Sequence, residues 1–241
     1  MRYVVSSDWH ADWLTLGHRR YEEVAEAAAH SVSYAIEQHV NAYVFLGDLT
    51  DPDSGGGTFR AINLAMTMAV RLARSGIRSI WIAGNHDVCE DGTGATTLDP
   101  LRALDGPFPV DVVTEPRLIG GTQEMVLCLP FAPASHGYDV ATEAERLYPE
   151  SGRVVVAAHL MLPGIHPGSE TEDMPRGREV LFPGEQTRGA VARMNGHYHA
   201  RQTHGLGDGG PDVIIPGSLA RLGFGEESNE PGFLLVDTGA P

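Results

Sequence analysis

Short, nearly continuous apolar runs recur along this sequence, and they constrain its fold more than any other feature. Each run is too short for a typical helix and is nearly all apolar, which is typical of buried strands in a sheet that is covered on both faces. Segments rich in polar residues, Gly and Pro separate the runs. We therefore predict strands over residues 3–5, 43–46, 77–83, 125–129, 154–158, 213–215 and 233–236.

Two stretches with helical periodicity lie between the first three predicted strands. Apolar residues recur at spacings of three and four over residues 21–36 and 62–73, as they do along the buried face of an amphipathic helix. Together these elements predict a βαβαβ unit. The second half is richer in strands, so we expect an α/β fold in which two mixed β-sheets are flanked by helices in four layers. We expect one domain over residues 1–241.

Two long segments have the composition of loops. Residues 92–109 are rich in Thr, Gly, Asp and Pro, and residues 163–187 contain several Pro-Gly pairs without any period. Such segments are expected to be irregular. Long loops in a compact domain are commonly lids or binding elements.

The chain is strongly acidic, with 32 Asp and Glu residues against 17 Lys and Arg and a formal net charge of -15. An acidic surface repels polyanions, and the sequence has no basic run of the kind that follows a nucleic-acid backbone. This disfavours extended duplex binding without excluding a nucleic-acid partner, and it identifies no protein partner. The N-terminus lacks a signal-peptide core and no apolar run is long enough to cross a bilayer, so we expect a cytoplasmic protein with no membrane partner.

Most of the predicted strands are followed by Asp, Asn or His. The polar clusters are Asp8-Trp9-His10, Gly47-Asp48, Gly84-Asn85-His86-Asp87, His159 and Gly196-His197-Tyr198-His199. Carboxylate, amide and imidazole groups that are repeatedly delivered to strand ends are what a two-metal hydrolytic site requires. Two cysteines, Cys89 and Cys128, do not have the spacing of a thiolate site, and we expect one loop thiol and one buried strand thiol.

The spacing within the clusters supports this interpretation. Asp8 and His10 lie two residues apart after a strand, so in extended backbone both side chains leave the same side. Asp48 follows a glycine at the end of an apolar strand, where its carboxylate can bridge two ions. Gly84 is expected to allow a tight turn that presents Asn85 as a neutral oxygen ligand.

In their order D-x-H, G-D, G-N-H-[DE], H and G-H-x-H, these clusters resemble the pattern of the calcineurin-like metallophosphoesterase superfamily. The resemblance runs from Asp8 to about Ser218 and implies the four-layer sandwich of that superfamily. It implies a first metal held by Asp8, His10, Asp48 and His199. It implies a second metal held by Asp48, Asn85, His159 and His197.

The resemblance also assigns the chemistry. His86 is implied as the residue that contacts the phosphate and protonates the leaving oxygen, and Asp87 is expected to fix the tautomer of His86 or a neighbouring ligand. Two divalent ions activate a water for in-line attack by hydroxide on phosphorus, so no protein nucleophile is needed. The ligand set without thiolate favours two Mn²⁺ ions, with Fe or Zn²⁺ as alternatives.

Within the superfamily the sequence is most similar to the SbcD-type exonuclease subfamily. The similarity includes residues 7–10, 47–51, 84–87, 196–202 and 215–218, with Phe224 and Glu226-Glu227 beyond them. The chain ends soon after this core, so we expect no DNA-capping domain. Our first hypothesis is therefore a phosphodiesterase of small diesters such as cyclic nucleotides, including the 2′,3′ forms.

Two other hypotheses stay open at this point. One is a minimal SbcD-like, Mn²⁺-dependent DNA exonuclease or endonuclease that works with an ATPase partner. The other is a metal-free binding module, which would be expected to have lost ligands, although none of the seven is substituted. Weak candidates for substrate contacts are Tyr198, which lies between two ligands, and His166, Arg176 and Arg178, which lie in the long loop after His159.

Overall fold

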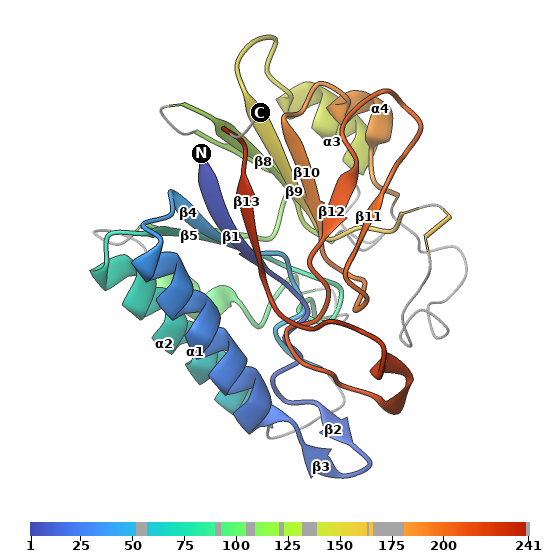
Figure 1. Ribbon diagram of the computed structural model, residues 1–241. Helices are drawn as coiled ribbons and strands as arrows, with labels where there is room; N and C mark the ends of the chain where they lie inside the picture. The colour runs from blue at the N-terminus through green and yellow to red at the C-terminus, as the bar shows by residue number, and fades with distance from the viewer. Residues whose placement is uncertain are drawn as a thin grey trace.

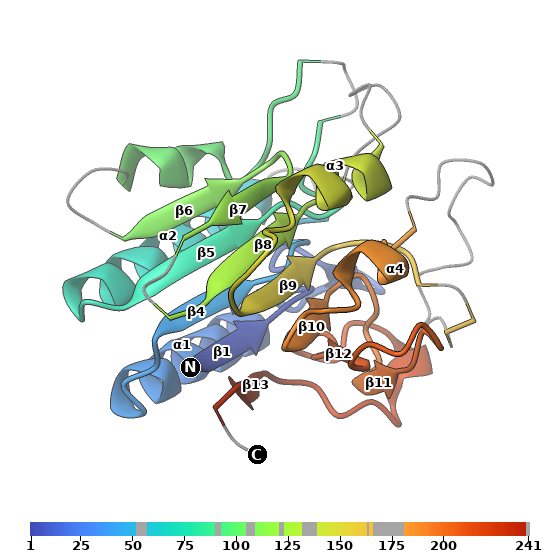
Figure 2. The same cartoon turned by 90° about the horizontal axis from the view of Figure 1, so that it is seen from above.

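The computed structural model describes residues 1–51, 57–89, 93–104, 109–120, 123–131, 139–162, 164–165 and 181–239. In this part of the chain, two mixed β-sheets pack face to face, and helices cover their outer faces (Figures 1 and 2). This arrangement confirms the predicted α/β fold with flanking helices.

The first sheet has the strand order β13-β1-β4-β5-β6. β1 (Arg2–Ser6), β4 (Ala42–Phe45), β5 (Arg78–Ile82) and β6 (Val110–Val113) are parallel, and β13 (Leu234–Asp237) is antiparallel to β1. The long helices α1 (Tyr21–Glu37) and α2 (Thr58–Arg74) make the crossovers and lie together on the outer face of this sheet (Figure 1). The predicted βαβαβ unit is thereby confirmed.

The second sheet has the order β11-β12-β10-β9-β8-β7. β8 (Met125–Leu129), β9 (Val154–Ala158), β10 (Ala192–Asn195) and β12 (Val213–Ile215) are parallel, while β7 (Arg117–Ile119) and β11 (Gln202–His204) are antiparallel edge strands. The helices α3 (Val140–Leu147) and α4 (Gly184–Thr187) lie on the side of this sheet away from α1 and α2 (Figure 1). The chain also forms a small hairpin, β2 (Leu14–Thr15) with β3 (His18–Arg19), and two short 3₁₀ helices, η2 (Asp99–Leu104) and η5 (Phe224–Glu226).

The alternation of side chains along β1 explains the layers. Tyr3 and Val5 point into the core between the two sheets, whereas Val4 packs with the apolar faces of α1 and α2. A third cluster covers the outer face of the second sheet, where Val154 and Val156 lie with Val140 of α3. Each fully buried aliphatic side chain stabilises the fold by about 1.5–3 kcal/mol. Both faces of both sheets are thus covered, which is why the central strands are nearly all apolar.

The structure adds elements to those that the sequence predicts. The segment 92–109, expected to be irregular, contains η2, and the segment 163–187, expected to be a loop, ends in the single turn of α4. Both are short, so they present too few residues for a recognisable period. Cys89 is exposed and Cys128 is buried in β8, as expected. None of the helices that the structure describes is both long and apolar enough to cross a membrane.

Candidate metal centre

The predicted ligands lie at one edge of the two packed sheets, at the carboxyl ends of parallel strands. Asp8 and His10 follow β1, Asp48 follows β4, and Asn85 follows β5 in the first sheet. His159 directly follows β9, and His197 and His199 come after β10 in the second sheet. Because parallel strands end at the same edge, two facing sheets bring residues far apart in sequence together there.

Six of the predicted ligands form two buried clusters. The first cluster consists of Asp8, His10 and His199. The second cluster consists of Asp48, His159 and His197. Within each, the candidate ligand atoms of the three residues all lie within 4.8 Å of one another. This division agrees with the two sets that the family resemblance implies.

Asp48 reaches toward both clusters. Its Oδ2 atom lies 3.3 Å from Nε2 of His159 and 3.7 Å from Nε2 of His10. Asn85 joins the second cluster, because its Oδ1 atom lies 3.0 Å from Nε2 of His159 and 3.0 Å from Nδ1 of His197. The Asp48 carboxylate is therefore placed where it can act as a ligand to two cations.

The second cluster has the donor chemistry that a divalent cation requires. Nδ1 of His159 donates a hydrogen bond to the carbonyl oxygen of Leu46 at 2.6 Å, so the neutral ring carries its lone pair on Nε2. That lone pair converges with the Asp48 carboxylate and the Asn85 amide oxygen in a buried space. Converging electron-rich atoms repel one another unless a proton or a metal ion lies between them. The oxygen and nitrogen donors fit Mn²⁺, Fe or Zn²⁺.

The pKa values of the second cluster also indicate that positive charge is favoured there. Although burial favours the neutral forms, the charge of Asp48 and its hydrogen bond raise the pKa of His159 to about 9. Burial likewise opposes ionisation of Asp48, but the charges of His159, His86 and His10 hold its pKa well below the usual value. The site therefore attracts a cation strongly, whether that cation is a proton or a metal.

Unusual backbone conformations concentrate at the predicted ligands. Among the described residues, six non-glycine residues have a positive φ, and four of them are Asp8 (49°), His10 (38°), Asp48 (59°) and His197 (77°). Left-handed conformations cost energy in L-residues and are retained where the surroundings impose them, often at functional sites. Hydrogen bonds impose them here, because the amide of Asp8 donates to the carbonyl of Gly47 and the amide of His197 donates to the Asp8 carboxylate at 3.1 Å.

Gly84 is required by close approach of two loops and not by a left-handed turn. The expected tight turn is present, since the amide of Asp87 donates to the carbonyl of Gly84 at 3.3 Å, but the φ of Gly84 is not in the positive range. A Cβ atom at this position would lie 2.6 Å from the amide nitrogen of Asp48 and 2.7 Å from Cε1 of His159, and it would overlap the Asp48 carboxylate. The absence of a side chain at Gly84 therefore lets the loops after β4 and β5 meet.

The Asp87 side chain joins these two loops through hydrogen bonds. Its buried carboxylate accepts hydrogen bonds from the amides of Asp48 (2.8 Å), Leu49 (3.0 Å) and Gly84 (3.0 Å) and from the hydroxyl of Thr97 (2.7 Å). Burial and the charge of Asp48 raise its pKa to about 6. Of the two roles expected for Asp87, these contacts favour orientation of the neighbouring ligand Asp48 over control of the His86 tautomer.

His86 lies at the open side of the centre. Its side chain is 28% exposed, whereas those of Asp48 and His159 are at most 1% exposed. The His86 ring contacts that of His10, with centroids 4.9 Å apart, and its Nδ1 atom lies 3.9 Å from the carboxylate of Asp51. An imidazole beside the predicted metal ligands and within reach of solvent is positioned to meet a bound substrate.

The expected substrate contacts fare differently. Tyr198 is 1% exposed, and its hydroxyl accepts a hydrogen bond from the amide of Leu162 at 2.7 Å. It therefore packs in the core and fixes a loop, which argues against Tyr198 as a candidate for substrate contact. His166, Arg176 and Arg178 lie outside the residues that the structure describes.

Two buried carboxylates to which the sequence assigned no role support the site. Asp12 accepts hydrogen bonds from the amide of Asp51 and the hydroxyl of Thr58, so it fixes the loop that carries Asp51. Glu226 contacts His199 at 2.6 Å. The subfamily resemblance at residues 224–227 pointed to Glu226, but no local pattern indicates which residue it would contact.

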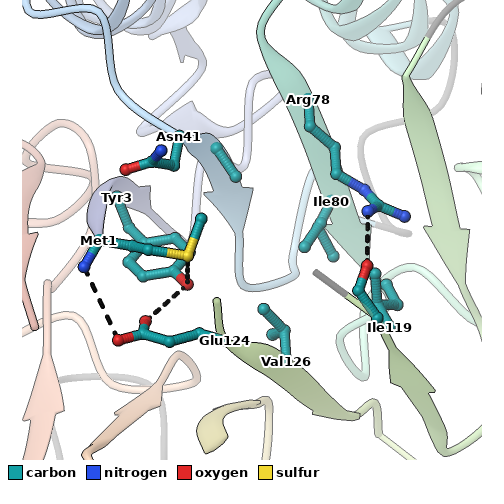
Figure 3. Close-up of a pocket in the computed structure, with 10 residues that line it drawn as sticks. Met1, Tyr3, Asn41, Arg78, Ile80, Ile119, Glu124 and Val126 are labelled. Carbon is teal, nitrogen blue, oxygen red and sulfur yellow. Dashed lines mark hydrogen bonds and ion pairs between the residues drawn. The ribbon is translucent and has the colours of Figure 1, made fainter. Parts of the chain in front are cut away.

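A cavity of about 440 Å³ lies at the opposite end of the strands (Figure 3). It is lined by residues at the beginnings of parallel strands, among them Tyr3, Ala42 and Arg78. The buried carboxylate of Glu124 points into it and accepts a hydrogen bond from the hydroxyl of Tyr3 (Figure 3). This cavity is separate from the metal centre, because the predicted ligands lie at the other ends of the same strands.

Comparison with known proteins supports the assignment of the fold and the family. The family model of calcineurin-like phosphoesterases matches residues 1–204. Among solved structures, a dimetal phosphatase from Danio rerio is 12% identical with a TM-score of 0.53, over 90% of this chain and 87% of that chain. A purple acid phosphatase from yellow lupin seeds is 14% identical with a TM-score of 0.56, over 86% of this chain and 39% of that chain. No curated protein gave a significant match.

Proposed function

Because the chain belongs to the calcineurin-like phosphoesterase family, we propose that this metal-dependent hydrolase is a phosphodiesterase of small diesters. Cyclic nucleotides, including the 2′,3′ forms, are the proposed substrate class, and two Mn²⁺ ions are the proposed cofactors. The observation that carries the proposal is the pair of buried clusters, with the Asp48 carboxylate reaching toward both and His86 at their open side.

The geometry of the clusters supports the ligand sets that the family resemblance implies. Asp8, His10, Asp48 and His199 would hold one ion, and Asp48, Asn85, His159 and His197 the other. When bound, two divalent ions supply a water nucleophile at neutral pH and neutralise the charge of the phosphate. The protein contributes rigid ligands, since Leu46 and Asp87 fix His159 and the Asp48 loop through hydrogen bonds.

In the proposed reaction, His86 is the catalytic acid. Phosphodiester hydrolysis expels an alkoxide, which is a poor leaving group unless it receives a proton. His86 is the half-buried imidazole at the open side, so it can donate that proton when it is charged.

The charge of the protein favours a small substrate. A net charge of -15 repels a nucleic-acid strand along its length, whereas a single diester carries only one negative charge to be neutralised. A small diester therefore needs no extended basic surface.

An SbcD-like nuclease is the alternative. It is favoured by the similarity at residues 215–218 and 224–227, and by the contact that Glu226 of this segment makes with His199 in the first cluster. On this alternative, oligonucleotides with free ends would be the substrates and an ATPase subunit a partner.

One comparison of substrates separates these alternatives. Purified protein loaded with Mn²⁺ is assayed on a 2′,3′-cyclic nucleotide, a linear oligonucleotide and a phosphomonoester. We expect the cyclic diester to have the highest kcat/KM and His86→Ala to lower it. Cleavage of the oligonucleotide alone would refute the small-diester proposal in favour of the nuclease, and cleavage of the monoester alone would refute both.

A further inference from the structure

Glu226 lies behind the first cluster and contacts one of its histidines. The residue belongs to η5, is 1% exposed, and places Oε1 2.6 Å from Nδ1 of His199. Its other carboxylate oxygen accepts a hydrogen bond from the amide of Leu222 at 2.7 Å. Both oxygens of this buried carboxylate are thus placed by specific contacts.

The contact determines which nitrogen of His199 is able to bind a cation. An ionised carboxylate accepts hydrogen bonds and cannot donate them, so Nδ1 of His199 carries the proton that joins it to Glu226. The lone pair of the neutral ring is then on Nε2, the nitrogen that is left for the site shared with Asp8 and His10. In metal sites generally, a carboxylate that accepts from the second ring nitrogen fixes the tautomer and the orientation of the histidine.

The segment that carries Glu226 is tied to the same site at several points. The amide of Ser218 donates to the carbonyl of His199, and the amide of Gly232 donates to the carbonyl of Ser218. These bonds hold the two ends of the loop that contains η5 against the turn that contains His199. The position of Glu226 is therefore coupled to the position of His199 through the backbone as well as through the side chain.

We propose that Glu226 is a positioning residue that fixes the Nδ1-protonated tautomer of His199 and so sets the affinity of the first metal site. This inference rests on the proposed two-metal function. It adds a residue that the family pattern of ligands does not include, and it gives the segment 219–232 a role in the metal centre.

Glu226→Gln is the informative substitution, because it preserves the shape of the side chain, removes its charge and replaces one acceptor oxygen with an NH₂ donor. The amide has one oxygen, which can accept from either the Leu222 amide or His199, but not from both positions at once. If the oxygen keeps the Leu222 bond, the amide NH₂ faces Nδ1 of His199, which must then accept. The ring proton moves to Nε2, and the nitrogen that faces the metal site loses its lone pair.

Two measurements on the intact chain test the proposal without using turnover. The first is the tautomer of His199 in metal-free protein, read from the ¹⁵N chemical shifts of its ring nitrogens and assigned with His199→Ala. The second is the binding of Mn²⁺ alone by calorimetry. We expect Glu226→Gln to move the proton to Nε2 and to weaken one of two Mn²⁺ sites by about 10- to 100-fold, while the other site keeps its affinity.

The matched control is Glu227→Gln, which removes the same charge from an exposed neighbour and should change neither readout. In the His199→Ala background, Glu226→Gln should have no further effect on Mn²⁺ affinity. An unchanged tautomer with unchanged Mn²⁺ affinity would overturn the proposal, and so would an equal loss in the His199→Ala background. If Glu226→Gln does not fold, Glu226→Asp is used instead, because its shorter side chain keeps the charge but moves it away from His199. The tautomer of His199 and the Mn²⁺ affinity of this variant then test the proposal.

The outcome is distinguishable from failure of the proposed function. If the wild-type protein binds two Mn²⁺ ions but cleaves no diester, the substrate proposal fails while the role of Glu226 is still tested. If Glu226→Gln leaves binding intact in an enzyme that hydrolyses diesters, the role of Glu226 alone is refuted.

Discussion

Gly84→Ala is the substitution for which the structure predicts the clearest effect. The added Cβ would lie 2.6 Å from the amide nitrogen of Asp48 and 2.7 Å from Cε1 of His159. Ordinary contacts of this kind begin at about 3.5 Å, so the two loops must separate by about 0.9 Å. Neither neighbour can yield easily, because the Asp48 amide donates to Asp87 and the His159 ring donates to the carbonyl of Leu46.

The expected cost has two components. Forcing an extra methyl group into a close-packed site lowers the free energy of unfolding by about 1–3 kcal/mol. A displacement of nearly 1 Å also moves Asp48 away from the second cluster, so we expect Mn²⁺ affinity to fall by at least about tenfold. Urea denaturation in the presence of EDTA measures the first component, and calorimetric titration of metal-free protein with Mn²⁺ measures the second.

Gly120→Ala is the matched control. A Cβ at Gly120 would meet no atom of the described residues within 4 Å, and the φ of this glycine is not in the positive range. We expect its free energy of unfolding to stay within about 0.5 kcal/mol of the wild-type value. If Gly84→Ala were as stable as Gly120→Ala and bound Mn²⁺ equally well, the close-approach argument would be refuted.

Three further predictions follow from single contacts. His86→Ala should slow hydrolysis of a diester with an alkoxide leaving group by about 10²–10⁴-fold but slow a nitrophenolate diester much less, and equal losses in steady-state assays would contradict the acid role. Burial would raise the pKa of Glu124, but hydrogen bonds from Thr238, Arg153 and Tyr3 lower it below 4.5. The ionised carboxylate therefore stabilises the fold above pH 4.5, and this stabilisation is lost as the pH falls through the lowered pKa. Glu124→Gln should therefore lower the free energy of unfolding by about 1–2 kcal/mol at pH 7 and by much less near pH 3 in urea titrations; a difference independent of pH would contradict this. Tyr198→Phe should cost about 1–3 kcal/mol of stability without raising KM, and a raised KM would restore Tyr198 to the substrate pocket.

The central strands were predictable because their environment is uniform. Strands covered on both faces are nearly all apolar, so β1, β4, β5, β8 and β9 appear as short apolar runs. β10 was not predicted, since its sequence includes Arg193, which is fully buried. The guanidinium is satisfied by Asp208 and by the carbonyls of Thr187 and Gly184, and such partners, distant in sequence, leave no local pattern.

Helix α3 could have been predicted. Asp139 caps it by accepting from the amide of Thr142, and Val140 and Ala144 are buried four residues apart on one face. The edge strands β7 and β11 are three residues long each, too short for any period to be recognised.

The candidate site likewise contains residues whose positions were predictable from the sequence and residues whose contacts were not. The strand-end positions of Asp8, Asp48 and His159 made their convergence predictable, because parallel strands end at one edge. The contacts of Asp87 and Glu226 were not predictable, since each depends on how separate loops are packed together.

An anomalous difference map at the Mn absorption edge, from crystals of Mn²⁺-loaded protein, tests the two-metal proposal most directly. We expect two peaks, one within coordination distance of Asp8, His10 and His199 and the other of Asp48, Asn85, His159 and His197. The Asp48 carboxylate should contact both ions. A single peak, or peaks away from the two clusters, would contradict the proposal.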